Sequence, residues 1–212
     1  MVLEKNPRTR PIAKKLLQLE DKVSGFAFPN MFRVRQITNS HCGPAVLTSL
    51  YSNLGVKTSQ KAIVGSLRVV NKIKKYGLNV GDMARGAKIV GKGAFVFWKK
   101  AGGKVSDLDA VINKYKYPVG VEWQGVFYED EDDDNGHYSI VTKIDKKTGF
   151  LRMSDPDHKF AGVDRKFKIK EFEKRWWDEN IIKGRVIPDK RVMFVIVPKG
   201  ESWPKKLGMV KA

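Results

Sequence analysis

Apolar side chains recur at helical spacing through the first half of the chain. Over residues 43–54 they recur every three or four positions, with Pro44 in the first turn and Gly55 as the stop, which predicts a buried helix. A second helix is predicted from residue 59 to about residue 75, ended by Gly77, with an apolar side formed by Ile63, Leu67, Val70 and Ile73. A third is predicted over about residues 81–90, and a fourth begins at Ser106, a favourable N-cap.

After Pro118 the pattern changes to that of β-strands. The run VGVEWQGVF is rich in β-branched and aromatic residues, and the segments 138–144 and 150–154 flank the turn sequence DKKTG, which predicts a hairpin. A further helix over about residues 170–177 precedes a last strand at residues 192–197. Helices followed by strands predict an α+β domain, with a helical layer packed on a mostly antiparallel sheet.

A chain of 212 residues and 24.1 kDa is long enough for one sizeable domain. We expect residues 1–24 to form an N-terminal arm and residues 25–212 to form the domain. With 42% hydrophobic residues the chain can bury a substantial core, and its single cysteine excludes a disulfide scaffold. It has no apolar run of the ~18 residues that a membrane helix needs and no secretory signal, so the expected compartment is the cytoplasm, without membrane contact.

The charge balance is strongly basic, with a formal net charge of +18. Six of the 23 acids stand together at Glu129–Asp134, so the rest of the chain is more basic still. Such a surface attracts polyanions, and weak non-specific binding follows from charge alone. The basic residues are scattered, without a nucleic-acid recognition motif, so a solvated basic surface explains them as well.

The most informative stretch is QITNSHCGPA, which places Cys42 directly before the Gly-Pro that opens a predicted helix. Free N–H groups and the helix dipole at that position favour an anion, and a thiolate is the form of cysteine that attacks a carbonyl carbon. A lone cysteine is often only a buried structural residue, so its neighbours decide between the two interpretations.

Three further side chains complete a catalytic set. Gln36 lies six positions before Cys42, where its amide and the Cys42 N–H can form an oxyanion hole. His137, at the start of a predicted strand, can take the thiol proton, and Asp155 can orient its ring. The DKKTG turn lies midway between His137 and Asp155, so the hairpin is expected to bring them nearly opposite each other on adjacent strands.

The other candidates are weaker. His41 precedes the cysteine and is expected to point away from it, and His158 lacks an evident orienting partner. One cysteine and three scattered histidines give no metal-ligand spacing, so neither a metal nor a cofactor is expected. The acidic run lacks the register of a calcium loop. It is either a solvated loop or an acidic rim in which Glu129, Asp130 and Asp132 bind basic substrate segments.

Taken in order, these residues resemble the bacteriocin-processing cysteine peptidases, the double-glycine leader peptidases, and their free-standing relatives in the papain-like superfamily. The matching segments run from Gln36 to Trp177 and include CGPAVLTSLYSNLG, GHYSIVTKID and SDPD. The resemblance implies a papain-like fold with Gln36 as oxyanion donor, Cys42 as nucleophile, His137 as base and Asp155 as orienting acid. His41 and the acidic insert before His137 depart from the family pattern, but neither removes one of these groups.

These observations leave three functions open. The first is a thiol-dependent hydrolase, a cysteine peptidase acting on a peptide or protein substrate and preferring basic segments. The second is a papain-like acyltransferase, which releases the acyl group to an amine or thiol and would use the same four residues. The third is a basic binding module without catalytic activity.

Overall fold

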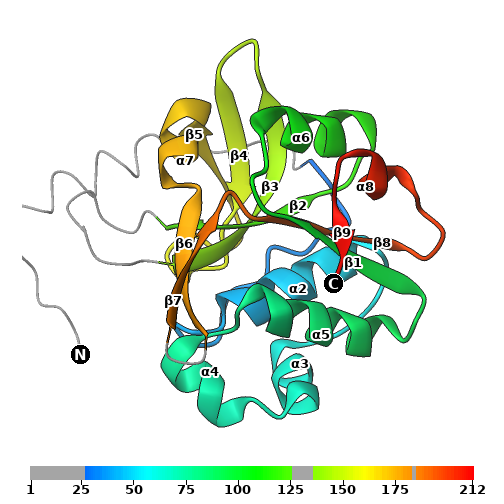
Figure 1. Cartoon of the computed structure of the whole chain (residues 1–212), viewed down its shortest axis with the longest axis vertical. Helices are drawn as coiled ribbons and strands as arrows, with labels where there is room; N and C mark the ends of the chain where they lie inside the picture. The colour runs from blue at the N-terminus through cyan, green and yellow to red at the C-terminus, as the bar shows by residue number, and fades with distance from the viewer. Residues whose placement is uncertain (1–26, 126–135, 183–184) are drawn as a thin grey trace, which may run out of the picture.

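The computed structural model describes residues 27–125, 136–182 and 185–212 (Figure 1). Its helices are α2 (Cys42–Asn53), α3 (Gln60–Leu67), α4 (Val70–Tyr76), α5 (Val80–Gly91), α6 (Val105–Asp109) with the π-helical turn η1 (Ala110–Lys114), α7 (Ile169–Arg175) and α8 (Trp203–Lys206). Its strands are β1 (Phe95–Lys100), β2 (Val119–Gln124), β3 (Gly136–Asp145), β4 (Phe150–Ser154), β5 (Asp164–Lys168), β6 (Trp177–Ile182), β7 (Arg185–Lys190), β8 (Met193–Pro198) and β9 (Val210–Lys211).

Within these ranges, seven strands form one antiparallel sheet in the order β5-β4-β3-β2-β8-β1-β9. The strands β6 and β7 pair only with each other and form a separate ribbon. Three of its pairings, β2-β3, β3-β4 and β4-β5, join strands that follow each other in the chain, and the others join strands from distant parts of it.

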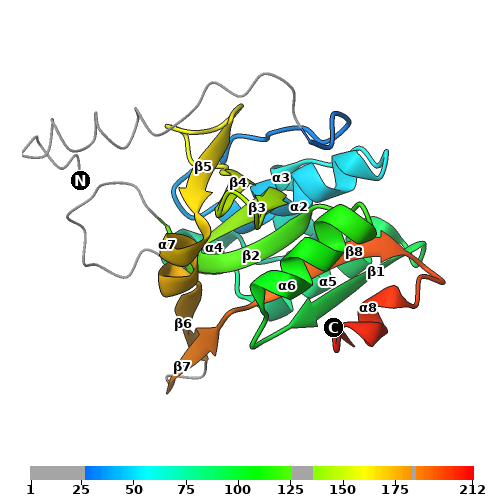
Figure 2. The same cartoon turned by 90° about the horizontal axis from the view of Figure 1, so that it is seen from above.

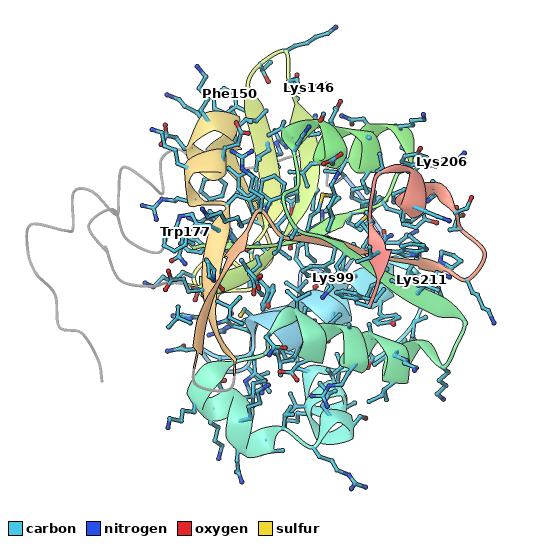
Figure 3. The ribbon with its side chains drawn as sticks, in the orientation of Figure 1. Lys99, Lys146, Phe150, Trp177, Lys206 and Lys211 are labelled. Carbon is cyan, nitrogen blue, oxygen red and sulfur yellow. The ribbon has the colours of Figure 1, made fainter. Side chains whose placement is uncertain are left out.

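Apolar side chains pack on both faces of this sheet, which gives the domain three layers. Helices α2 to α5 cover one face and α6, α7 and α8 cover the other (Figures 1 and 2). Strand β8 contributes side chains to both apolar cores, because Phe194 belongs to the core on the α2 side and Val195 to the core on the α6 side. Side chains fill the space between the sheet and the helices on each side (Figure 3).

The predicted α+β class with a mostly antiparallel sheet is confirmed. The predicted helix over residues 43–54 is α2, and the third predicted helix is α5, capped by the side chain of Asn79. The predicted hairpin is the β3-β4 pair, and the predicted strand over residues 192–197 is β8, although the short strand β9 follows it.

The predicted second helix is wrong as a single element, because the chain breaks it into α3 and α4. Arg68 adopts a left-handed conformation with φ +56°, and its N–H caps the end of α3 by bonding to carbonyls in the preceding turn. The break rotates the chain, so Val69 is buried in place of Val70, which is 51% exposed. The other members of the predicted apolar side, Ile63, Leu67 and Ile73, are buried as predicted. The predicted end at Gly77 is confirmed by its φ of +66°.

Other differences concern elements that depend on distant partners. Strand β1 lies in the half of the chain predicted to be helical and pairs with β8 about a hundred residues later. The ribbon β6-β7 was also missed. The fourth helix begins at Val105 with Lys104 as its N-cap, so Ser106 lies in the first turn instead of capping it, and the Asp107 carboxylate accepts the Lys104 N–H at 2.8 Å.

The predicted arm at residues 1–24 lies outside the described residues, and so its boundary with the domain stays a prediction. In the described ranges, none of the helices combines the length and the apolar character needed to cross a bilayer.

Gly120 allows β2 to pack against the ring of Phe194, because a Cβ atom at Gly120 would lie 2.1 Å from a ring carbon. We expect Gly120→Ala to lower the free energy of unfolding by about 2 kcal/mol through overpacking. The control is Gly65→Ala in α3, where a Cβ meets nothing within 4 Å and helix propensity should rise. Urea denaturation of both variants measures this, and equal stability of the two would contradict the packing role.

Candidate functional site

Cys42 is the first residue of α2, with Gly43 and Pro44 completing the start of the helix. The N-cap residue His41 makes no side-chain capping bond, and no acidic residue lies in the first turn. Neither the Cys42 N–H nor the Gly43 N–H bonds to an acceptor among the described residues, and Pro44 has no N–H. The sulfur therefore lies at a helix end whose free donors and dipole favour a negative charge.

His137 lies at the start of β3 and is 3% exposed. Its Nε2 lies 2.8 Å from Asp155 Oδ1, which leaves Nδ1 as the ring nitrogen available to Cys42. Burial lowers the pKa of His137, but the charge of Asp155, its hydrogen bond and a hydrogen bond with Cys42 together raise that pKa to about 10. The imidazole is consequently held in its protonated form over most of the neutral range.

Asp155 follows β4 directly, and its carboxylate is almost fully buried. Besides His137, Oδ1 accepts the Asp157 N–H at 3.0 Å, and Oδ2 accepts Arg165 Nη1 at 2.7 Å. Burial raises the pKa of Asp155, but His137, Arg165 and the Asp157 N–H outweigh burial and hold it well below its ordinary value. The carboxylate is therefore fixed in position and ionised by three donors.

The sequence did not identify Arg165, because it is one of 41 basic residues in a chain without a pattern that distinguishes it. It lies on β5, is buried, and its guanidinium stacks 3.5 Å from the ring centre of Phe160. An aromatic contact and a buried carboxylate are the surroundings that retain a buried cation.

The register of the β3-β4 hairpin differs from the predicted one. On the turn side Lys143 lies opposite Arg152, and beyond a β-bulge Ile140 lies opposite Ser154. Continuing that register would place Asp155 opposite Ser139, two residues from His137. In this register Asp155 and His137 are diagonal neighbours on one face of the hairpin, which still brings their side chains to hydrogen-bonding distance.

Gln36 precedes α2 in a loop and is 6% exposed. Its backbone N–H donates to the Pro156 carbonyl at 2.8 Å, so Gln36 lies next to the segment that carries Asp155. Its side chain makes no hydrogen bond among the described residues, and its buried Oε1 is without a partner. Gln36 is thus a buried residue whose amide donor is unused, in a loop bonded to the segment that follows Asp155.

A second polar cluster lies beside the histidine, and no motif in the sequence predicted it. Glu122 accepts a hydrogen bond from the hydroxyl of Tyr138, and Gln124 Nε2 donates to Asp178 Oδ1 at 3.1 Å. Burial raises the pKa of Tyr138 well above 10, and the charges of Glu122, Cys42 and Asp178 raise it further. The Tyr138 ring lies against the start of α2, because a Cβ atom at Gly43 would be 3.6 Å from one of its carbons.

Asp178 also explains the glycine before the histidine. A Cβ atom at Gly136 would lie 2.4 Å from the Asp178 carboxylate. A side chain at residue 136 would displace the Asp178 carboxylate, so glycine lets this carboxylate lie against the start of β3, next to His137.

The remaining sequence candidates lie apart from this set or outside the described ranges. His41 is a buried N-cap residue hydrogen-bonded through Nδ1 to Thr38, and burial lowers its pKa. His158 lies at the surface, 3.4 Å from Asp157. Glu129, Asp130 and Asp132 lie outside the described residues, so their role in substrate binding stays a prediction.

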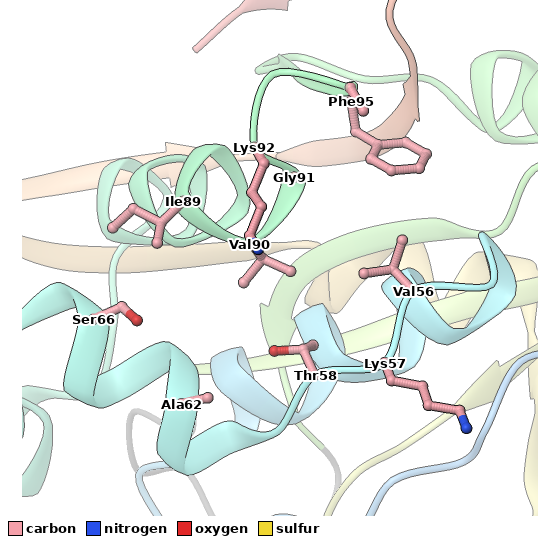
Figure 4. Close-up of a pocket in the computed structure, with 11 residues that line it drawn as sticks. Val56, Lys57, Thr58, Ala62, Ser66, Ile89, Val90, Gly91, Lys92 and Phe95 are labelled. Carbon is pink, nitrogen blue, oxygen red and sulfur yellow. The ribbon is translucent and has the colours of Figure 1, made fainter.

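The described ranges contain no group of three or more His, Cys, Asp or Glu side chains arranged to hold a metal ion. One surface pocket of about 470 Å³ lies between α3, α5 and the segment after α2 (Figure 4). It is lined by residues such as Val56, Ala62 and Phe95, at the end of α2 opposite Cys42, and is therefore separate from the site.

The site places a sulfur at a helix N-terminus, an imidazole beside it and a carboxylate behind the imidazole. These are the requirements for an activated nucleophile with a general acid and base, and an unused amide donor adjoins them. The arrangement is chemically able to carry out acyl transfer from an amide or ester to the thiol.

The fold of this chain is similar to that of solved structures of peptidases. No protein-family model matches the chain, and neither does any curated protein sequence. A C39-like peptidase from Bacillus anthracis is similar with a TM-score of 0.59 and 14% identity, over 83% of this chain and 98% of that one. The peptidase domain of Streptococcus ComA, a bi-functional ABC transporter involved in quorum sensing, has a TM-score of 0.52 and 21% identity, over 78% and 97%.

A third similar structure is a double glycine motif protease from an AMS/PCAT transporter, in complex with its leader peptide. Its TM-score is 0.51 and its identity 14%, over 86% of this chain and 100% of that one. At these identities the likeness shows the fold. The predicted resemblance to the double-glycine leader peptidases is thus confirmed in the fold of the chain.

The raised pKa of His137 predicts how stability depends on pH. Because the folded-state value of about 10 exceeds the ordinary 6.5, the contribution of His137 to the free energy of unfolding is complete below pH 6.5. It is lost as pH rises through about 10. Urea denaturation of the wild type and His137→Gln should show a stability difference that shrinks over this range, and a difference that grows with pH would contradict the assignment.

Proposed function

We propose that this protein is a cysteine peptidase, a thiol-dependent hydrolase that cleaves a peptide or amide bond through an acyl-enzyme on Cys42. The bond of 2.8 Å between His137 and Asp155, with the other ring nitrogen left for Cys42, is the observation that supports this most directly. Residues 25–212 form the peptidase domain in this proposal, and residues 1–24 form an arm.

In the first half of the reaction, the Cys42 thiolate attacks the carbonyl carbon of the scissile bond. The carbonyl oxygen becomes negative and accepts hydrogen bonds from the Gln36 amide and the Cys42 N–H. His137, protonated because its pKa is about 10, donates its proton to the leaving amine, and the C–N bond breaks to leave a thioester on Cys42.

In the second half, neutral His137 takes a proton from water, and the resulting hydroxide attacks the thioester. The C–S bond breaks, the acid product leaves, and the thiolate and the protonated imidazole are restored. Asp155 stays ionised throughout and orients the ring, as the carboxylate does in other triads. Arg165 keeps that carboxylate in place through its 2.7 Å bond.

The substrate in this proposal is a peptide that enters the site in an extended form. Cys42 is only 8% exposed, so residues with small side chains on the acyl side of the scissile bond fit best. A double glycine motif protease and a leader peptide are named in one similar structure, which makes a peptide ending in Gly-Gly the first probe to use. The acidic residues Glu129, Asp130 and Asp132 are expected to favour basic residues elsewhere in the peptide.

Turnover of a peptidyl-Gly-Gly-aminomethylcoumarin substrate tests the proposal. Cys42→Ala should abolish turnover, and His137→Gln should lower kcat by at least about 10²-fold because proton transfer is lost. His158→Gln, which changes an exposed histidine, is the matched control and should retain wild-type activity.

Mass spectrometry of the product distinguishes hydrolysis from acyl transfer, because a free acid indicates hydrolysis and a product joined to an added amine indicates transfer. Full turnover by Cys42→Ala would exclude a thiol mechanism. Slow iodoacetamide labelling of Cys42 in the wild type, with the pH profile of an ordinary thiol, would favour a binding module.

The oxyanion role of Gln36 gives a separate prediction. Gln36→Ala should lower kcat by about 10²-fold, the effect of removing one oxyanion donor. It should leave the rate of Cys42 alkylation by iodoacetamide unchanged, since alkylation develops no oxyanion. A parallel loss of alkylation would instead show that Gln36 maintains the sulfur or the histidine.

A further inference from the structure

The loop that carries Gln36 is held on both sides by one side chain from α3. Gln60 Oε1 accepts the Ile37 N–H at 3.1 Å, and Gln60 Nε2 donates to the Arg35 carbonyl at 2.7 Å. One amide group thus bonds to the residue before Gln36 and to the residue after it, as a neighbouring strand would.

The side chain of Gln60 bonds to the loop and is not needed to cap its own helix. It is the first residue of α3, and Ser59 already caps that helix by accepting the Ala62 N–H at 3.2 Å. The Gln60 side chain is 6% exposed, although helix starts readily present polar groups to solvent. A buried amide with both its ends bonded to one loop is costly to remove, because its loss leaves backbone groups without partners.

The orientation of Gln36 depends on its backbone. The Gln36 side chain forms no hydrogen bond with the described residues, so its own polar atoms do not fix the direction of the amide. Its backbone N–H is held by the Pro156 carbonyl, and the backbone groups on either side are held by Gln60. These three bonds determine where the Gln36 amide is presented.

We propose that Gln60 is a positioning residue for the oxyanion hole, acting through Gln36 without touching the substrate. This rests on the proposed peptidase function. Gln60 fixes the peptide groups that flank Gln36, and the Gln36 amide then meets the developing oxyanion without having to reorganise. Because that benefit is realised in the transition state, Gln60 contributes to kcat and little to KM.

Gln60→Met, which keeps the length of the side chain but loses both bonds, should lower kcat about 10-fold with KM nearly unchanged. Gln60→Glu keeps the acceptor for Ile37 but sets a buried carboxylate oxygen against the Arg35 carbonyl, so it should lower kcat as well. Lys61→Met, at the exposed next position of α3, is the matched control and should show wild-type kinetics. The rate of Cys42 alkylation should stay at its wild-type value in all three.

A double-mutant cycle separates positioning from a general loss of structure. In a Gln36→Ala background, Gln60→Met should cause no further loss of kcat, because the donor that it positions is absent. An additive loss, or slower alkylation of Cys42 in Gln60→Met, would overturn the proposal. If Gln60→Met does not fold, the same cycle with Gln60→Glu decides it.

Amide hydrogen exchange tests the role of Gln60 in the loop without depending on catalysis. In Gln60→Met the Ile37 amide should exchange at least about 10-fold faster than in Lys61→Met, since its acceptor is lost. Unchanged exchange overturns the positioning role. A wild-type protein without peptidase activity but with this exchange difference would contradict the proposed function while leaving the role of Gln60 in the loop intact.

Discussion

The ionised carboxylate of Asp155 is the group on which the site depends. Burial of a lone carboxylate is strongly unfavourable, and here the bonds from His137, Arg165 and the Asp157 N–H compensate for it. The same carboxylate fixes the ring of His137 and raises its pKa. Removing one partner therefore affects both the stability of the fold and the protonation state of the imidazole.

The fold brings these groups together through polar contacts as well as through its apolar cores. At the bulge of β3, the Thr142 hydroxyl donates to Asp164 at 2.7 Å, and Asp164 pairs with Arg33 through both carboxylate oxygens. Arg33 thereby ties the segment before Gln36 to β5, the strand that also carries Arg165. Strand β5 therefore supports both the segment before Gln36, through Asp164, and Asp155, through Arg165.

A glycine and a buried amide support the segments that carry His137 and Gln36. Gly136 lets β6 contact the start of β3, where Asp178 lies against the backbone of the histidine strand. On the other side of the site, Gln60 holds the loop of Gln36 from the start of α3. Gln36, Asp155 and His137 are thus each supported by a buried polar residue from another segment, which is the usual way to limit the motion of catalytic groups.

Local patterns in the sequence determined the helix that begins at Cys42, the β3-β4 hairpin, the α+β class and the choice of Gln36, Cys42, His137 and Asp155 as candidates. Helix periodicity, turn residues and residue chemistry are properties of neighbouring positions and can be read without a partner. The left-handed cap at Arg68 is local, but no turn residue marks it in the sequence. Strand β1, the bulge that shifts the hairpin, and the supporting residues Arg165, Gln60 and Asp178 were decided by tertiary structure. Each of these depends on a bond or a packing contact with another segment of the chain, and no local pattern records such a partner.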